Sequence, residues 1–289
     1  MEIVGLLFNV ILMVFIVTTM LTAGFGTTLD QLGAVLSRFG LVAMVLVTGF
    51  VIRPLIGWGT AELLGLAVPA YLAMVLLWSC PGAPFGAKLV MTAKADLQTG
   101  AVLQVLMAAI GSLTFAPTAN LIIGAADLGD DVSLPVADLI RTVALLQLLP
   151  FVVGVLVRHW TPDRATEFGA FTAKVSGQTF LFVLAGALLG SWRDVIDLLG
   201  SLVLIAAALV SAVMIAIGWL LSARERRTRW ATALIQPCSN SGPAFAAVAI
   251  AFDNDPAILG AITAILLLQI LVGLPTASFV GRSRTAVAA

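Results

Sequence analysis

The sequence predicts an all-α polytopic membrane protein in which two of the spanning helices are discontinuous. Two observations lead to this fold class. Apolar runs recur along all 289 residues, of which 61% are hydrophobic and only 10% are charged, whereas a soluble domain carries about 25% charged residues. In addition, two of the apolar runs contain prolines and glycines where a spanning helix is normally continuous.

The apolar runs predict nine spans, because about 20 apolar residues cross the hydrocarbon core of a bilayer. The spans are expected at residues 3–25, 38–58, 67–93, 97–123, 138–158, 171–190, 199–221, 231–251 and 256–280. The longer runs allow for tilt or for short interfacial turns. The first run is expected to be a retained helix, because no basic segment precedes it as in a signal peptide.

The distribution of charge predicts the orientation. Most of the basic residues fall in loops and ends on one side: Arg38, Lys94, Arg158, Arg164, Lys174, Arg224, Arg226, Arg227, Arg229, Arg282 and Arg284. The other side holds two acidic segments, 125–138 and 253–255. The positive-inside rule then places the C-terminus in the cytoplasm and the N-terminus outside the inner membrane. The formal net charge of zero argues against a nucleic-acid partner.

The two interrupted runs have related sequences. The first contains "WSCPGAPFGAKLVM" (78–91) and the second "LIQPCSNSGPAFAAV" (234–248). Within them the short sequences "GAPFGA" and "SGPAFAA" are similar. The residues expected to break the helices are Pro81, Gly82, Pro84, Pro237, Gly242 and Pro243. Corresponding interruptions in the two halves of a chain are typical of transporters built from repeats.

Each interruption has a physical cost that predicts its surroundings. Proline removes an N–H donor and clashes with the carbonyl one turn earlier, and an orphaned group in hydrocarbon costs several kcal/mol. Such breaks are therefore expected inside the protein or beside a wet cavity. Each break also leaves a half-helix N-terminus, which attracts anions. We expect the two breaks to meet and form a polar site within the membrane. The alternative is that the prolines only kink two structural helices.

Lys88 is the main candidate for the charge of this site. A lysine within a span costs a few kcal/mol and commonly marks a pathway or a partner. Its ammonium group would attract an anion or replace a bound metal ion, and a lowered pKa would let it carry a proton. The alternative is that Lys88 reaches interfacial water. The predicted substrate-binding residues are Lys88, Asn240, Ser239, Ser241, Pro84, Phe85 and Gln236, with Lys88 and Gln104 expected to serve coupling.

Other polar residues in the runs allow several interpretations. The two cysteines, Cys80 and Cys238, lie one in each break and would suit a soft ion, although such cysteines more often only pack. Four glutamines could hydrogen-bond across helices: Gln104, Gln147, Gln178 and Gln269. No metal site and no cofactor is expected.

The two interrupted stretches resemble the crossovers of the bile acid:sodium symporter family. The resemblance lies in "SCPGAPFGAK…AKADLQTGAVLQ" and "SNSGPAFAAVAIAF", with further matches at "GFGTTL", "RPLIG" and "LLPFVVGVLVR". It covers nearly the whole chain and suggests a nine-span member. It implies two inverted repeats forming a panel domain (residues 1–34 and 131–195) and a core domain (35–130 and 196–289). It also implies an organic anion bound between the two domains and transport driven by sodium.

The chain departs from the family pattern at the positions that bind sodium. Where sodium-binding members have Ser-Asn in the first crossover, this chain has Gly86 and Ala87. Gly100 and Gln104 replace hydroxyl residues, Ile235 replaces a glutamate, and Gly49 replaces a glutamine. Degenerate sodium sites are therefore expected, with Lys88 supplying the missing positive charge.

The sequence thus predicts a secondary transporter that moves a small organic anion by alternating access, independently of sodium or coupled to protons. No His-Glu-x-x-His pattern or intramembrane Asp pair favours an enzyme. Three alternatives stay open: an efflux carrier for a thiophilic oxyanion, a sodium-coupled symporter with atypical sites, and a non-transporting sensor. The expected partners are the lipid bilayer, a small anionic substrate and, if Lys88 titrates, protons. The oligomeric state is left open.

Overall fold

The computed structural model describes residues 2–83, 85–126, 134–190, 192–198, 200–222 and 225–288. These residues are almost entirely helical, and within them no strand forms beyond a single isolated β-bridge. An all-helical chain is what the composition requires, because a helix satisfies its backbone hydrogen bonds internally where lipid offers none.

The helices follow the predicted apolar runs. The first half of the chain contains α1 (Glu2–Phe25), α2 (Leu29–Leu36), α3 (Phe39–Val47), the π-helical turn η1 (Thr48–Ile52), α4 (Arg53–Leu63), α5 (Val68–Trp78), α6 (Phe85–Thr92) and α7 (Leu97–Ala125). The second half contains α8 (Val136–Val143), η2 (Ala144–Leu148), α9 (Leu149–Trp160), α10 (Pro162–Gly190), α11 (Trp192–Asp197), α12 (Leu202–Leu220), α13 (Arg226–Ile235), α14 (Ser241–Ala251) and α15 (Pro256–Ala288).

The prediction of a polytopic membrane protein is confirmed. In the described part of the chain, six helices are long and apolar enough to cross a membrane, and two shorter apolar helices, α5 and α14, accompany them. The predicted runs 67–93 and 231–251 are each divided into two half-helices, α5 with α6 and α13 with α14. The count of nine spans stays a prediction.

Four other prolines stand in helices that continue past them: Pro54, Pro117, Pro150 and Pro275. Pro54 follows η1 and Pro150 follows η2, and in both places the helix continues into α4 or α9. A π-helical turn shifts the backbone hydrogen bonds by one residue, which accommodates a position that has no N–H to donate. Proline alone therefore does not distinguish the broken spans from the continuous ones.

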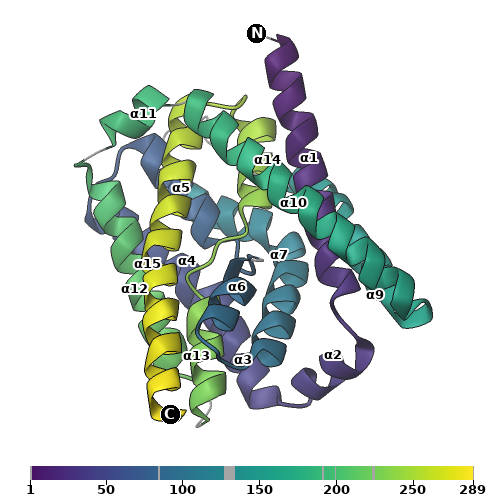
Figure 1. The fold of residues 1–289 in the computed structure, drawn as a ribbon. Helices are drawn as coiled ribbons and strands as arrows, with labels where there is room; N and C mark the ends of the chain where they lie inside the picture. The colour runs from purple at the N-terminus through teal and green to yellow at the C-terminus, as the bar shows by residue number, and fades with distance from the viewer. Residues whose placement is uncertain are drawn as a thin grey trace.

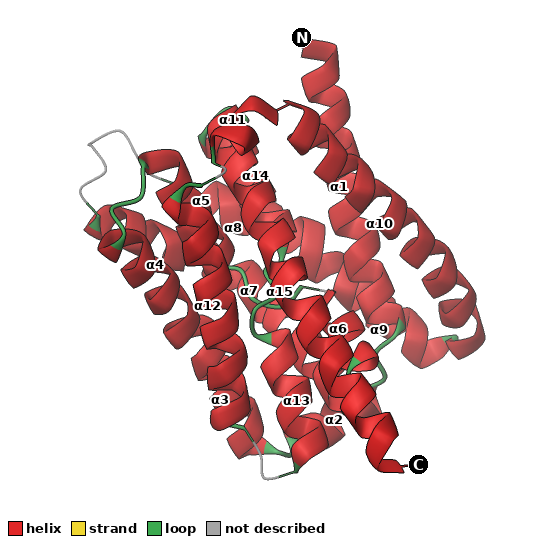
Figure 2. Cartoon of the chain, turned by 60° about the vertical axis from the view of Figure 1, so that its left-hand side comes forward, coloured by secondary structure: helices red, strands yellow, loops and turns green. Residues whose placement is uncertain are grey.

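Helix α1 packs against α9 and α10 along one side of the molecule, while α4, α5, α12, α13 and α15 pack together on the other (Figures 1 and 2). The approach of α1 to α9 depends on glycine: a Cβ on Gly24 would lie 2.4 Å from the Phe151 carbonyl oxygen, and one on Gly154 would lie 2.9 Å from the Gly24 Cα. Small residues allow such close helix contacts in membranes. The predicted panel, with its boundaries at residues 34, 130 and 195, stays a prediction.

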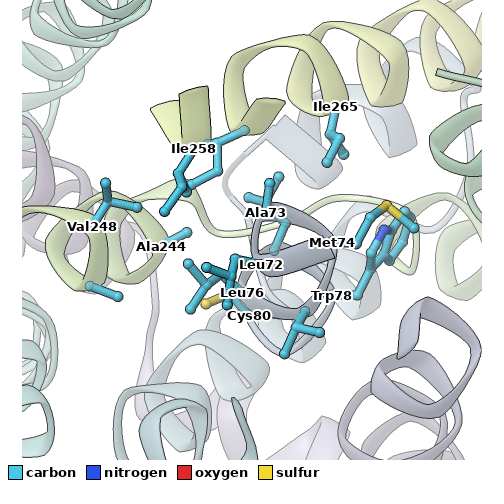
Figure 3. Close-up of a cluster of buried hydrophobic side chains, with 14 of the residues drawn as sticks. Leu72, Ala73, Met74, Leu76, Trp78, Cys80, Ala244, Val248, Ile258 and Ile265 are labelled. Carbon is cyan, nitrogen blue, oxygen red and sulfur yellow. The ribbon is translucent and has the colours of Figure 1, made fainter. Parts of the chain in front are cut away.

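Helix α5 lies at the centre of the main hydrophobic cluster. Every residue from Ala70 to Trp78 is buried, and Figure 3 shows side chains of α14 and α15 gathered around it. Trp78 packs directly on Gly57 of α4, where a Cβ would lie 2.6 Å from the Trp78 Cβ. A helix covered on all sides is apolar all round. The first break therefore begins inside the main hydrophobic cluster, which includes both Trp78 and Cys80.

Candidate functional site

The two interrupted helices meet at their breaks, as the sequence predicts. The first break separates α5 from α6, and the second separates α13 from α14. Pro81 and Ser239 form an isolated antiparallel bridge, and the Asn240 N–H donates to the Cys80 carbonyl oxygen at 2.8 Å. Each break thus supplies hydrogen-bond partners for backbone groups of the other. These bonds reduce the free-energy cost of unpaired backbone groups in a membrane.

The predicted break residues take different positions. Pro81, Gly82 and Pro237 lie in the unwound segments, and Pro84 lies outside the described residues. Gly82 has φ +93°, and a Cβ there would lie 2.4 Å from the Ala108 amide nitrogen, so only glycine fits. Gly242 and Pro243 lie in the first turn of α14, where a proline removes no intrahelical hydrogen bond.

Asn240 caps the second half-helix and ties it to another span. Its Oδ1 accepts from the Gly242 N–H at 3.4 Å, and its Nδ2 donates to Gln147 Oε1 at 3.0 Å. The same Gln147 oxygen accepts from Ser112 Oγ of α7 at 3.2 Å. The start of α14 is therefore fixed by a side-chain amide from η2, and the prediction that Gln147 bridges helices is confirmed.

Ser239 makes three hydrogen bonds where the two breaks meet, one through its backbone N–H and two through its hydroxyl oxygen. Its N–H donates to Gln269 Oε1 at 3.0 Å, and Gln269 Nε2 donates back to Ser239 Oγ at 2.8 Å. Arg53 Nη2 donates to the same hydroxyl oxygen at 2.5 Å. Ser239 thus joins α4, the second break and α15.

Arg53 is a site residue that the sequence reasoning missed. Its side chain is 0% exposed, Nη1 donates to the Trp78 carbonyl oxygen at 3.1 Å, and the guanidinium carbon lies 4.9 Å from the centre of the Trp78 ring. The available signal was its place within the apolar run 38–58, because a charged residue inside a span is a candidate functional residue.

A cavity of about 560 Å³ adjoins the crossing. One wall comes from α1 and α10, and the other comes from α6, α7, the second break and α15. The predicted site residues that line it are Phe85, Lys88, Gln104, Ser239, Asn240 and Ser241. Figure 1 shows α1 and α10 side by side along the outside of the molecule, with α6 and α7 next to them.

Comparison with known proteins agrees with this architecture. A model of the Sodium Bile acid symporter family matches residues 11–215. The chain belongs to this family. A curated relative is the "Probable sodium/metabolite cotransporter BASS2, chloroplastic" of Oryza sativa subsp. japonica, which is 23% identical over 203 residues, or 70% of this chain and 47% of that protein. The chain spans about half the length of this relative.

Three of the positions expected to differ from the sodium-binding pattern lie together in this member of the Sodium Bile acid symporter family: Gly86, Gln104 and Ile235. A Cβ on Gly86 would lie 2.8 Å from Gln104 Oε1 and 3.3 Å from the Ile235 Cα. Ile235 is fully buried, and no group of three or more His, Cys, Asp or Glu residues that could hold a metal ion occurs among the described residues. Next to Gly86 the chain therefore has the amide of Gln104 and the side chain of Ile235, where the family pattern is expected to have a glutamate.

The remaining predicted residues differ in their access to the cavity. Lys88 is exposed and lines it, whereas Gln236 is 1% exposed and is not part of the lining. Both amide atoms of Gln236 lack a hydrogen-bond partner in the described structure, as does Gln104 Oε1. Cys238 lines the cavity and donates to the Leu234 carbonyl, while Cys80 is buried behind it.

The wall from α1 and α10 carries hydroxyl groups that the sequence reasoning also missed. Thr19 and Ser176 share a hydrogen bond of 2.5 Å, and Thr22 donates to Thr172 at 2.8 Å. Thr19, Thr22 and Ser176 line the cavity. Single threonines in an apolar run give no signal in a sequence, because their hydroxyls can bond to their own helix.

Proposed function

We propose that this protein is a secondary transporter that moves a small organic anion by alternating access without sodium coupling. Membership of the Sodium Bile acid symporter family and two broken helices meeting at a cavity support a transporter. Neither the family nor the site favours an enzyme. The observation that carries the choice of substrate is the chemistry of the cavity lining, which contains Lys88 and no acidic side chain among the described residues.

The lining suits an anion with an apolar body. Hydrogen-bond donors come from Lys88, Asn240, Ser239 and Ser241, and they stand at the start of α6 and α14, where helix dipoles favour negative charge. Much of the remaining lining is apolar, including the rings of Phe15, Phe85 and Phe180. A volume of about 560 Å³ lies within the usual range of small-molecule sites, roughly 300–1,000 Å³. An organic carboxylate fits these features.

The absence of sodium coupling rests on the ligands that the chain lacks. Sodium is a hard cation and needs several oxygen ligands. The corresponding positions hold Gly86, Ala87, Gly100, Gln104 and Ile235. Lys88, exposed to the cavity, would serve as a fixed charge or as the carrier of a proton.

Alternating access would proceed by movement of the panel against the core, with α1 and α10 on one side of the cavity and the broken helices on the other. The C-terminus would lie in the cytoplasm and the N-terminus outside the inner membrane. The start of α1 and the end of α15 lie at opposite ends of the molecule, which supports termini on opposite sides of the membrane (Figures 1 and 2).

Uptake into proteoliposomes tests the proposal. We expect uptake of at least one of a series of labelled carboxylates, from propionate through benzoate to cholate, at equal rates with sodium or choline outside. Strong dependence on sodium would refute uncoupled transport, and binding without uptake would indicate a sensor. Lys88→Ala should lower the rate about tenfold or more, because a charge-assisted hydrogen bond is worth about 1.5–3 kcal/mol, whereas Lys174→Ala on exposed α10 serves as the control.

A further inference from the structure

The guanidinium of Arg53 is a buried charge without a counterion. It is the one charged side chain among the described residues that is buried, and no acidic side chain of these residues forms an ion pair with it. An unpaired charge in a protein interior costs several kcal/mol unless dipoles and hydrogen bonds stabilise it. The groups around Arg53 must therefore supply that stabilisation.

Those groups are the ones that would hold a cation. Nη1 donates to the Trp78 carbonyl oxygen at the C-terminal end of α5, which carries partial negative charge. Nη2 donates to Ser239 Oγ, which lies shortly after the C-terminal end of α13. The face of the Trp78 ring lies 4.9 Å from the guanidinium carbon and adds a cation–π contact. Arg53 thus fills the place where two broken helices turn their negative ends toward each other.

Ser239 connects the charged Arg53 side chain with the cavity through its hydrogen bonds. Its Oγ accepts from Arg53 and from Gln269, which uses both lone pairs of the oxygen. The amide orientation of Gln269 is fixed, because its Oε1 must accept from the Ser239 N–H. The hydroxyl proton of Ser239 is then left to be donated elsewhere, and Ser239 lines the cavity.

We propose that Arg53 is a resident cation of the crossing and that it makes Ser239 the hydrogen-bond donor for the bound anion. The guanidinium takes the place of an exchangeable cation at the negative ends of α5 and α13. It also polarises the Ser239 O–H, which donates a hydrogen bond to a carboxylate in the cavity. The second part of this proposal rests on the proposed function; the first part does not.

The first part is tested by the melting temperature of the purified full chain in sodium chloride and in choline chloride. The wild type, Arg53→Lys and the surface control Arg282→Gln should melt at the same temperature in both salts. Arg53→Gln removes the positive charge and should melt several degrees higher in sodium chloride than in choline chloride. A folded Arg53→Gln protein that melts equally in both salts would overturn the resident-cation role, as would a wild type stabilised by sodium.

The second part is tested by titrating the protein with benzoate, an aromatic carboxylate matched to the phenylalanines of the lining. Ser239→Ala should bind benzoate about tenfold more weakly, since a hydrogen bond to a charged group is lost, and Ser239→Thr should restore the affinity. The exposed serine variant Ser37→Ala is the control. Equal affinity in Ser239→Ala and the wild type would overturn the donor role. A wild type that binds none of the carboxylates would refute the anion site and leave the result with the two salts standing.

Discussion

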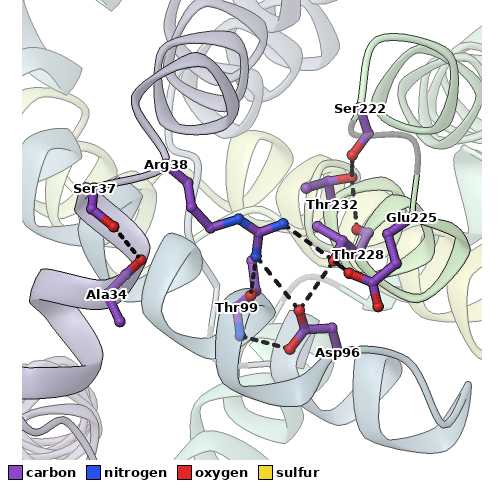
Figure 4. Close-up of polar contacts among 9 residues, drawn as sticks. All are labelled: Ala34, Ser37, Arg38, Asp96, Thr99, Ser222, Glu225, Thr228 and Thr232. Carbon is purple, nitrogen blue, oxygen red and sulfur yellow. Dashed lines mark hydrogen bonds and ion pairs between the residues drawn. The ribbon is translucent and has the colours of Figure 1, made fainter.

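Two arginines join the first half of the chain to the second, in opposite surroundings. Arg38, which is 37% exposed, donates to Thr99 Oγ1 at 3.0 Å and lies 3.8 Å from Asp96 Oδ2. Thr228 of α13 donates to the same carboxylate at 3.1 Å, as Figure 4 shows. Arg53 is completely buried and has only a carbonyl, a hydroxyl and an aromatic face as partners.

The surroundings of the two arginines indicate different roles. An exposed pair with its own acid is neutral overall and contributes about 0–1 kcal/mol, so the Arg38 cluster fastens the ends of α3, α7 and α13. A buried guanidinium without an acid keeps its net charge, and Arg53 holds that charge beside Ser239, a residue of the cavity lining. Substitutions where the two broken helices meet should therefore cost more stability than substitutions around Arg38.

Gly82→Ala should cause the largest loss of stability. The substitution places a side chain at φ +93° and pushes it into the α7 backbone at Ala108, which costs about 3 kcal/mol or more from strain and overpacking together. Gly65 also has positive φ, at +56°, but a Cβ there meets open space, so Gly65→Ala should cost about 1–2 kcal/mol. Apparent melting temperatures in detergent check the order, and equal losses would contradict the packed geometry of the crossing.

Arg53→Met should cost more stability than Arg38→Met. The first leaves the Trp78 carbonyl and one lone pair of Ser239 without donors in the interior, a loss of about 1–3 kcal/mol. The second exposes its former partners to water and should cost less than about 1 kcal/mol. Thermal melts of the two variants in the same detergent make the comparison. A larger loss of stability in Arg38→Met would contradict the conclusion that Arg53 contributes more to the fold than Arg38.

Gln269→Leu should destabilise the crossing by about 1–3 kcal/mol, because the Ser239 N–H loses its acceptor in a buried place. It should also weaken benzoate binding, since Ser239 Oγ then has a free lone pair and its proton is less strictly directed. Gln178 on α10 is exposed, and Gln178→Leu should leave both properties unchanged. Unaltered melting of Gln269→Leu would show that Ser239 does not depend on this amide.

Asp96 should make the stability of the fold depend slightly on pH. Partial burial by itself would raise the pKa of this carboxyl, but hydrogen bonds from Thr99 and Thr228 and the charge of Arg38 outweigh it and lower the pKa below its ordinary value of 3.8. The carboxylate therefore stabilises the fold above about pH 4, and this stabilisation is lost as the pH falls through the lower, folded-state pKa.

The measurement is the melting temperature of the wild type and of Asp96→Asn between about pH 6 and 3. We expect the difference between the two proteins to shrink as the medium becomes acidic. A constant difference over this range would show that the charge of Asp96 does not stabilise the cluster.

The broken helices could be predicted from the sequence because their cause is local. Prolines and glycines such as Pro81 and Gly82 act on the backbone where they stand, and two similar interruptions imply that each meets the other. The same reasoning placed Lys88, Asn240, Ser239 and Ser241 at the breaks, and all four line the cavity. Their roles as substrate-binding residues stay predictions.

What the sequence did not reveal depends on contacts between distant segments. The place of Arg53 in an apolar run marks it as a candidate functional residue, but its contact with Ser239 is formed only by the fold. Gln236 was predicted to support the site, yet it is 1% exposed and does not line the cavity. The hydroxyls of Thr19 and Ser176 became part of a wall only because α1 and α10 pack side by side.

The bridge between Pro81 and Ser239 has a consequence for how the protein is made. The Cys80 carbonyl receives its hydrogen bond from Asn240, which belongs to the other half of the chain and leaves the ribosome much later. Until then the first break lies in the bilayer with an unsatisfied backbone, a state that hydrocarbon penalises. The hydrogen bonds of the first break can therefore be completed only after Asn240 has been synthesised, late in the translation of the chain.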